Sequence, residues 1–96
     1  MRTEEFIDKH LEAGNVVILI NDTNFVDESK NILKELGIES KNPTILCTGA
    51  KKIKQYKRQY ENSWYFCHYK KYYGKYFNTY CLILNPLFGP NKEDKN

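Results

Sequence analysis

The sequence predicts a single small α+β domain that has a mixed four-stranded sheet and two to three helices. Two observations lead to this fold class. The apolar run Val16–Ile20 and the shorter run Thr44–Cys47 flank a helical pattern, which is the order of a parallel βαβ unit. Segments 64–70 and 76–84 are rich in aromatic and β-branched residues and flank Tyr72-Tyr73-Gly74-Lys75, which predicts a C-terminal antiparallel hairpin.

Apolar residues recur at helical spacing in three further segments, at about residues 3–14, 25–37 and 50–61. Gly14 and Gly37 suit the ends of the first two helices, because glycine readily adopts the left-handed conformation that ends a helix. The third segment has an extended basic strand as its alternative, but the spacing favours a helix. Its buried stripe would be Ile53, Tyr56 and Tyr60.

Length and composition are those of one globular domain. Ninety-six residues, 41% of them hydrophobic, suffice for one core, which we assign to residues 1–88, and we expect residues 89–96 to form a mobile polar tail. The longest apolar run is too short to cross a bilayer and the N-terminus lacks a signal-peptide pattern, so we expect a cytoplasmic protein with no membrane partner. The three cysteines are too scattered for a disulfide framework, and we expect them to be reduced and buried: Cys47, Cys67 and Cys81.

Charge and aromatic residues concentrate in one third of the chain. Residues 51–76 carry eight cations and one acid, whereas residues 1–50 carry five cations and nine acids. All eight tyrosines lie between Tyr56 and Tyr80, interleaved with these cations. Long cations contact phosphates and exposed rings stack on bases, so this mixture is typical of surfaces that bind nucleic acids.

We therefore predict a small non-enzymatic binding protein whose basic, tyrosine-rich face contacts a nucleic acid or a nucleic acid–protein complex. Size and composition also fit a phage or mobile-element inhibitor of a nuclease-based defence system, an anti-CRISPR-like role. The residues predicted to form the binding face are Lys51, Lys52, Lys54, Lys57, Arg58, Tyr65, Tyr69, Lys70, Lys71, Tyr72, Tyr73 and Lys75.

The alternation of side chains along the predicted hairpin separates core rings from surface rings. A two-residue turn at Tyr73-Gly74 puts Trp64 opposite Ile83. Phe66 and Phe77 share the face of Trp64, and we expect all three rings to pack in the core. The opposite face would carry Tyr65, Tyr69, Tyr80 and Leu82.

Two alternative functions stay open at this stage. A small metal-independent ribonuclease of the toxin–antitoxin kind would use His68 for proton transfer, with Lys54 and Arg58 on the scissile phosphate. A protein–protein interaction module would pair through its aromatic hairpin with itself or with a partner protein. For the oligomeric state we expect a monomer or a small homo-oligomer. The sequence has no zinc-ligand spacing, no glycine-rich phosphate loop and no paired nucleophile and base, so we expect no metal and no cofactor, and the pattern favours a protein that is not an enzyme.

Overall fold

The computed structural model describes residues 3–60 and 63–86, and it confirms the α+β fold class. The elements, in chain order, are α1 (Thr3–Glu12), β1 (Val17–Ile20), the 3₁₀ turn η1 (Thr23–Phe25), α2 (Val26–Glu35), β2 (Thr44–Cys47), α3 (Ala50–Gln59), β3 (Trp64–Tyr72) and β4 (Lys75–Leu84). None of the helices in these two ranges is long and apolar enough to span a membrane. The predicted tail 89–96 and the predicted domain boundary at residue 88 lie outside the described residues.

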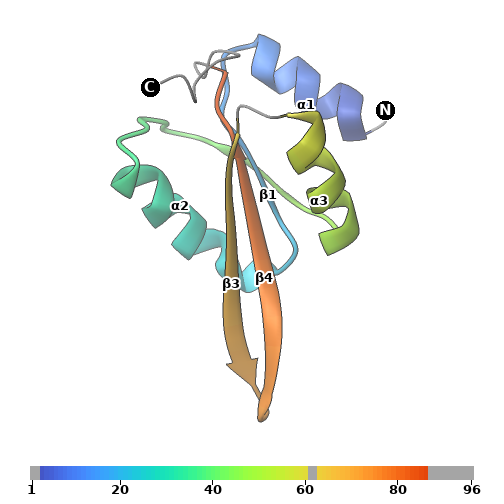
Figure 1. Cartoon of the computed structure of the whole chain (residues 1–96). Helices are drawn as coiled ribbons and strands as arrows, with labels where there is room; N and C mark the ends of the chain where they lie inside the picture. The colour runs from blue at the N-terminus through green and yellow to red at the C-terminus, as the bar shows by residue number, and fades with distance from the viewer. Residues whose placement is uncertain (1–2, 61–62, 87–96) are drawn as a thin grey trace, which may run out of the picture.

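The four strands form one mixed sheet in the order β2-β1-β4-β3 (Figure 1). Strands β1 and β2 are parallel and are connected through α2, as the βαβ pattern predicts. Strand β4 runs antiparallel to both β1 and β3. Trp64 pairs with Ile83, so the register that the two-residue turn predicts for the hairpin is confirmed.

Helices cover both faces of this sheet. On one face, α1 and α3 contribute Ile7, Ile53 and Tyr56 to a buried cluster that includes Leu19 and Leu82. On the other face, η1 and α2 pack against the remaining sheet residues (Figure 1). All four residues of β1 are therefore buried, because helices cover both sides of this strand.

Glycines end the first two helices, as the sequence predicts. Gly37 has a φ of 74°. Its N–H donates to the carbonyl of Lys34, and the N–H of Ile38 donates to the carbonyl of Leu33, both at 3.0 Å. This pair of bonds is a Schellman motif, which satisfies carbonyls at the helix end. Gly14, with a φ of 86°, ends α1 by the same kind of turn.

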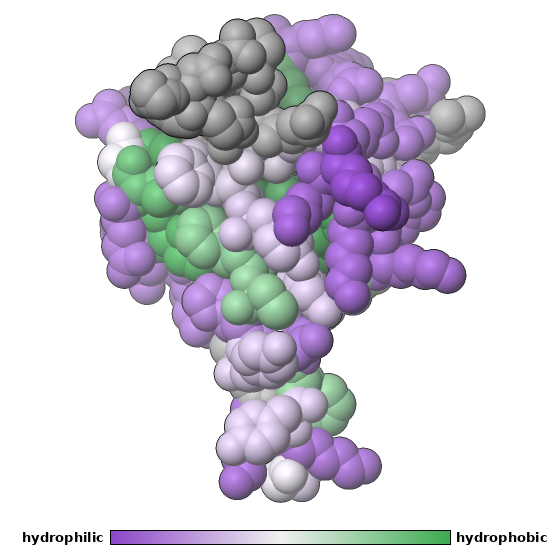
Figure 2. Space-filling model, in the orientation of Figure 1, coloured by the Kyte–Doolittle hydropathy of each residue, from purple (hydrophilic) through white to green (hydrophobic). Residues whose placement is uncertain are grey.

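The hairpin extends well beyond the rest of the sheet. Strand β1 pairs with residues 81–84 of β4, so, among the residues that the structure describes, residues 75–80 of β4 have β3 as their one strand neighbour. We call this two-stranded part, residues 67–80, the ribbon; it projects from the body of the molecule (Figures 1 and 2). Its tip is a two-residue turn in which Tyr73 and Gly74 both have positive φ, at 50° and 79°, the geometry of a type I′ turn.

One side chain joins the ribbon to the sheet where β1 stops. The Asn21 side chain accepts a hydrogen bond from the N–H of Tyr80 at 2.8 Å and donates one to the carbonyl of Asn78 at 3.1 Å. These two groups of β4 would otherwise have pointed to the next residues of a longer β1. Asn21 thus extends the β1–β4 ladder by one pair without extending the strand.

Candidate polyanion-binding surface

Helix α3 carries most of the predicted cations. Its sequence AKKIKQYKRQ contains five cations and no acid, which are Lys51, Lys52, Lys54, Lys57 and Arg58, all exposed. Ile53 and Tyr56 are buried and Tyr60 is half-buried, so the helical interpretation of this segment is confirmed and the extended alternative is wrong.

Two of these cations lie over tyrosine rings of the hairpin. The Nζ of Lys57 lies 4.2 Å from the ring centroid of Tyr65, and the Nζ of Lys54 lies 5.0 Å from that of Tyr80. The two rings stack on each other with centroids 6.0 Å apart. Burial, the largest cause, raises the pKa of Tyr65 to about 12, so this phenol stays neutral at physiological pH. Cations and rings from separate parts of the chain therefore share one face of the sheet.

The same face continues along the ribbon. Alternation places Tyr69 and Lys71 of β3 on the side of Tyr65, and register pairs Lys71 with Tyr76 of β4. The Nζ of Lys71 lies 5.6 Å from the ring centroid of Tyr76. Tyr69 and Tyr76 are 71% and 70% exposed, so both rings are open to a partner. We name the whole set the basic-aromatic face: Lys51, Lys54, Lys57, Arg58, Tyr65, Tyr69, Lys71, Tyr76 and Tyr80.

Several other predicted residues lie elsewhere. Lys52 is on the opposite flank of α3 from Lys54, with its Nζ 6.0 Å from the centroid of the Tyr56 ring. Tyr73 is fully exposed at the tip, and the alternation of β4 puts Lys75 on the face away from α3. The backbones of Lys70 and Tyr72 belong to β3, and their side chains lie outside the described part of the structure.

Sequence reasoning missed Tyr76, which is absent from the predicted binding residues. The signal was nevertheless present, because the confirmed hairpin register pairs Tyr76 directly with Lys71. Side chains of directly paired residues point to the same side of a sheet. The same alternation, applied to the first residues after the turn, would have placed Tyr76 on the basic-aromatic face.

His68 lies on the opposite face of the sheet. It pairs with Thr79, and its ring centroid lies 5.3 Å from that of Phe25 and 6.3 Å from that of Phe66, on the α2 side. Lys54 belongs to α3 and contacts the other side. The structure therefore does not bring His68 together with Lys54 and Arg58, the three residues of the ribonuclease alternative.

Two of the three rings that we expected in the core are exposed. Trp64 is 40% and Phe77 is 48% exposed, whereas Phe66 packs against the α2-side cluster. The register was right, but Phe77 lies in the ribbon beyond the reach of the helices, and Trp64 begins the edge strand. The parity of a strand residue determines its side of the sheet; a covering element is still needed to bury it.

The cysteines divide in the same way. Cys81 is fully buried, and burial raises the pKa of its thiol to about 12. Cys47 at the end of β2 and Cys67 in the ribbon are exposed, so the expectation that all three are buried was wrong for these two. Within residues 3–60 and 63–86, no group of three or more His, Cys, Asp or Glu side chains is placed to hold a metal ion.

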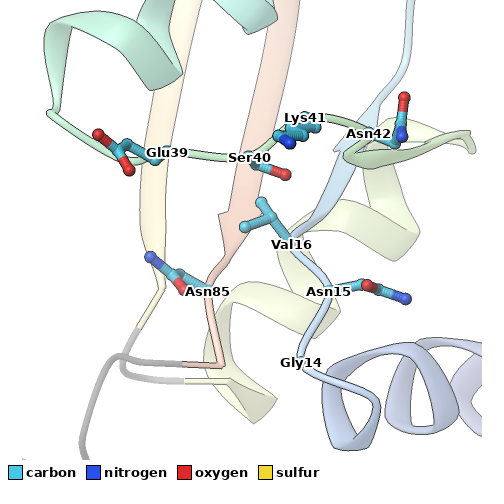
Figure 3. A pocket seen from close by; sticks show the side chains of 8 residues that line it. All are labelled: Gly14, Asn15, Val16, Glu39, Ser40, Lys41, Asn42 and Asn85. Carbon is cyan, nitrogen blue, oxygen red and sulfur yellow. The ribbon is translucent and has the colours of Figure 1, made fainter.

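A shallow hollow of about 340 Å³ lies at the other end of the sheet (Figure 3). It is formed by the α1–β1 turn, the α2–β2 loop and the end of β4. Glu39 and Asn85 point to one side and Asn15 and Asn42 to the other, so the polar groups diverge (Figure 3). Ligand sites require polar groups that converge on one molecule, and the basic-aromatic face is the better candidate.

Comparison of the chain with protein-family models, with curated proteins and with solved structures finds no match.

Proposed function

We propose that the protein binds nucleic acid, free or held by another protein, through its basic-aromatic face. The observation that carries this proposal is the convergence of cations and rings from two distant segments. Lys54 and Lys57 of α3 lie over Tyr80 and Tyr65 of the hairpin, on one side of the sheet. A surface that combines cations with open rings fits the sugar-phosphate backbone and the bases of one ligand.

The charges of α3 suit phosphate contacts. No acid interrupts its five cations, and its first turn starts at Gly49 without a side-chain cap. The exposed N–H groups at the start of a helix add partial positive charge to that of Lys51. Each phosphate that a lysine or arginine neutralises releases counterions, which makes the resulting affinity strongly salt-dependent.

Acidic α1 sets the direction of the ligand along the surface. It carries Glu4, Glu5, Asp8 and Glu12 and packs beside α3 on the same side of the sheet. The ribbon leaves the sheet away from α1 (Figure 1). A polyanion is repelled by α1, so we infer a path from α3 onto the ribbon, where Tyr69 and Tyr76 supply stacking at about 1–3 kcal/mol per base.

The test is charge reversal on each side of the sheet. We expect Lys51→Glu/Lys54→Glu/Arg58→Glu to lower the affinity for labelled single- and double-stranded oligonucleotides by at least ~10-fold, and to lower the slope of log affinity against log salt by about one per cation. Fluorescence anisotropy across a salt series measures both quantities.

The matched control is Lys30→Glu/Lys34→Glu/Lys41→Glu, which changes the net charge equally on exposed residues of α2 and its following loop. We expect it to retain most of the affinity. An equal loss in both triple variants would show that net charge alone is responsible, and a wild-type affinity that does not depend on salt would contradict the proposal.

A further inference from the structure

The ribbon is a two-stranded element with one long open edge. Strand β3 is the last strand of the sheet, and within the described residues its one strand neighbour is β4. From Cys81 toward the tip, no third strand of residues 3–60 and 63–86 pairs with the ribbon. A two-stranded hairpin is at best marginally stable in water, and a third strand or a covering helix normally supports it. The ribbon thus has the geometry of an element that gains stability from a further strand.

The hydrogen bonds of Asn21 show which groups face the open edge of β3. The Tyr80 N–H and the Asn78 carbonyl point toward Asn21, away from β3. Backbone groups alternate in direction along a strand, so Thr79 and Cys81 bond to their partners in β3, which are even-numbered. The odd-numbered residues of β3 therefore direct their N–H and C=O groups outward: Tyr65, Cys67, Tyr69 and Lys71.

We propose that the open edge of β3 pairs with β3 of a second copy of the chain, antiparallel and centred on His68. This register pairs all nine residues of the strand. It places Lys71 of each copy opposite Tyr65 of the other and Cys67 opposite Tyr69, so the cationic end of each strand meets an aromatic end. A register centred on Lys71 brings the two copies of this lysine opposite one another, which like-charge repulsion opposes, and a register centred anywhere else than His68 pairs fewer residues of the two strands. The charge pattern thus favours the register centred on His68, which gives a dimer and no longer assembly.

Such a dimer has a geometric consequence for binding. The two-fold axis of an antiparallel strand pair is perpendicular to the sheet, so both copies present the same face on the same side. The ribbons become the middle of an eight-stranded sheet, with the two basic-aromatic faces side by side. That the dimer has a doubled nucleic-acid footprint rests on the proposed function; the dimer itself does not.

The experiment substitutes one outward N–H. Proline is tolerated at edge positions whose N–H faces solvent, yet it cannot donate to a new strand. We expect the wild-type chain to dimerise reversibly in sedimentation equilibrium without nucleic acid, Cys67→Pro to be monomeric, and Cys67→Ser, which keeps the N–H, to dimerise like the wild type. Circular dichroism verifies that Cys67→Pro is folded.

Hydrogen exchange gives a readout that does not depend on a variant. In the dimer, we expect the amides of Tyr65, Cys67, Tyr69 and Lys71 to exchange at least ~10-fold more slowly than in diluted monomer, while Phe66 and His68 change little. A chain that is monomeric at all concentrations overturns the proposal. So does a dimer that Cys67→Pro leaves intact, since its interface must lie elsewhere. A wild-type chain that dimerises but does not bind nucleic acid would contradict the proposed function and leave the dimer proposal standing.

Discussion

The two halves of β4 differ in burial although they belong to one continuous strand. Residues 79–84 are buried, whereas residues 75–78 are exposed on both faces. The exposed half is also the more polar, but composition alone does not explain the difference, since the apolar Phe77 is 48% exposed whereas Leu82 is fully buried. Residues 81–84 lie between β1 and β3 and under helices on both sides, and Thr79 and Tyr80 are buried next to them. Within the described residues, residues 75–78 have neither β1 nor a helix beside them. We call residues 81–84 the base; residues 75–80 belong to the ribbon.

The comparison shows that residues of this hairpin are exposed where neighbouring strands and helices do not extend far enough to cover them. Strand β1 has four residues and β4 has ten, so a strand that is buried at one end must project at the other. Exposed rings cost little at the ribbon if they serve contact with a partner. The base provides stability, and the ribbon provides the reach of the basic-aromatic face.

The largest expected difference between the halves is in core packing. We expect Leu82→Ala in the base to lower the free energy of unfolding by about 2–5 kcal/mol, because it leaves a cavity between β1, α3 and β3. Phe77→Ala in the ribbon should cost roughly 1 kcal/mol, since the ring is 48% exposed. Urea denaturation measures both; equal losses would show that the ribbon is part of the core.

The junction between the halves should be the next most sensitive. Asn21→Ala removes the bonds to Tyr80 and Asn78 and leaves both groups without that partner, which we expect to cost about 1–2 kcal/mol. Amide exchange at Tyr80 should accelerate first. Asn42→Ala, an exposed asparagine of the α2–β2 loop, is the control and should change neither quantity. Unchanged exchange at Tyr80 would contradict the role of Asn21.

The thiol of Cys81 in the base should make the stability of the protein depend on pH. Burial raises the pKa of Cys81 to about 12, so the folded state holds this proton more tightly than the unfolded state. Its contribution to stability is complete below the ordinary thiol pKa and declines as pH rises toward 12, by at most about 1.4 kcal/mol per pH unit. Cys81→Val should make the alkaline decline in the free energy of unfolding shallower.

Thiol labelling compares the base with the ribbon directly. A thiol reagent at neutral pH should label exposed Cys67 rapidly and Cys81 only on unfolding. Equal labelling would show that the base opens.

The smallest effect concerns a hydrogen bond that joins α1 to α3. The Tyr60 hydroxyl donates to the Asp8 Oδ1 at 2.6 Å, and burial followed by this bond raises the pKa of Tyr60. We expect Tyr60→Phe to cost about 0.5–1.5 kcal/mol in thermal unfolding, as a typical hydrogen bond does. Tyr76→Phe in the ribbon removes an exposed hydroxyl and should shift stability by only a few tenths of a kcal/mol. A larger loss of stability in Tyr76→Phe than in Tyr60→Phe would contradict the expectation that the ribbon contributes little to stability.

Local patterns were sufficient to predict most of the fold. The β-branched run of β1, the glycines that end α1 and α2, and the turn at Tyr73-Gly74 each depend on neighbours in sequence. The turn also determined the hairpin register, and with it the side on which Tyr65 and Tyr69 lie. This is why the side of the sheet on which each of these rings lies could be predicted correctly.

Burial in the hairpin could not be predicted in the same way. Whether Phe77 is covered depends on where β1 meets β4, and whether Trp64 is covered depends on the place of β3 at the edge of the sheet. Both are tertiary properties. The contacts of Lys54 and Lys57 with Tyr80 and Tyr65 likewise depend on the packing of α3 against the sheet. Spacing along a helix predicts the face of the helix on which each lysine lies, but it does not predict which ring of the sheet that lysine contacts.

The side chain of Asn21 also has a mechanical consequence. The six residues of β4 from Lys75 to Tyr80 span about 20 Å at the usual rise of a strand. An arm of that length turns a tilt of about 10° at its base into a displacement of roughly 3.5 Å at its tip. Asn21 bonds to β4 at the base of this arm, so we expect a substitution there to change the direction of the arm while every residue on it stays the same.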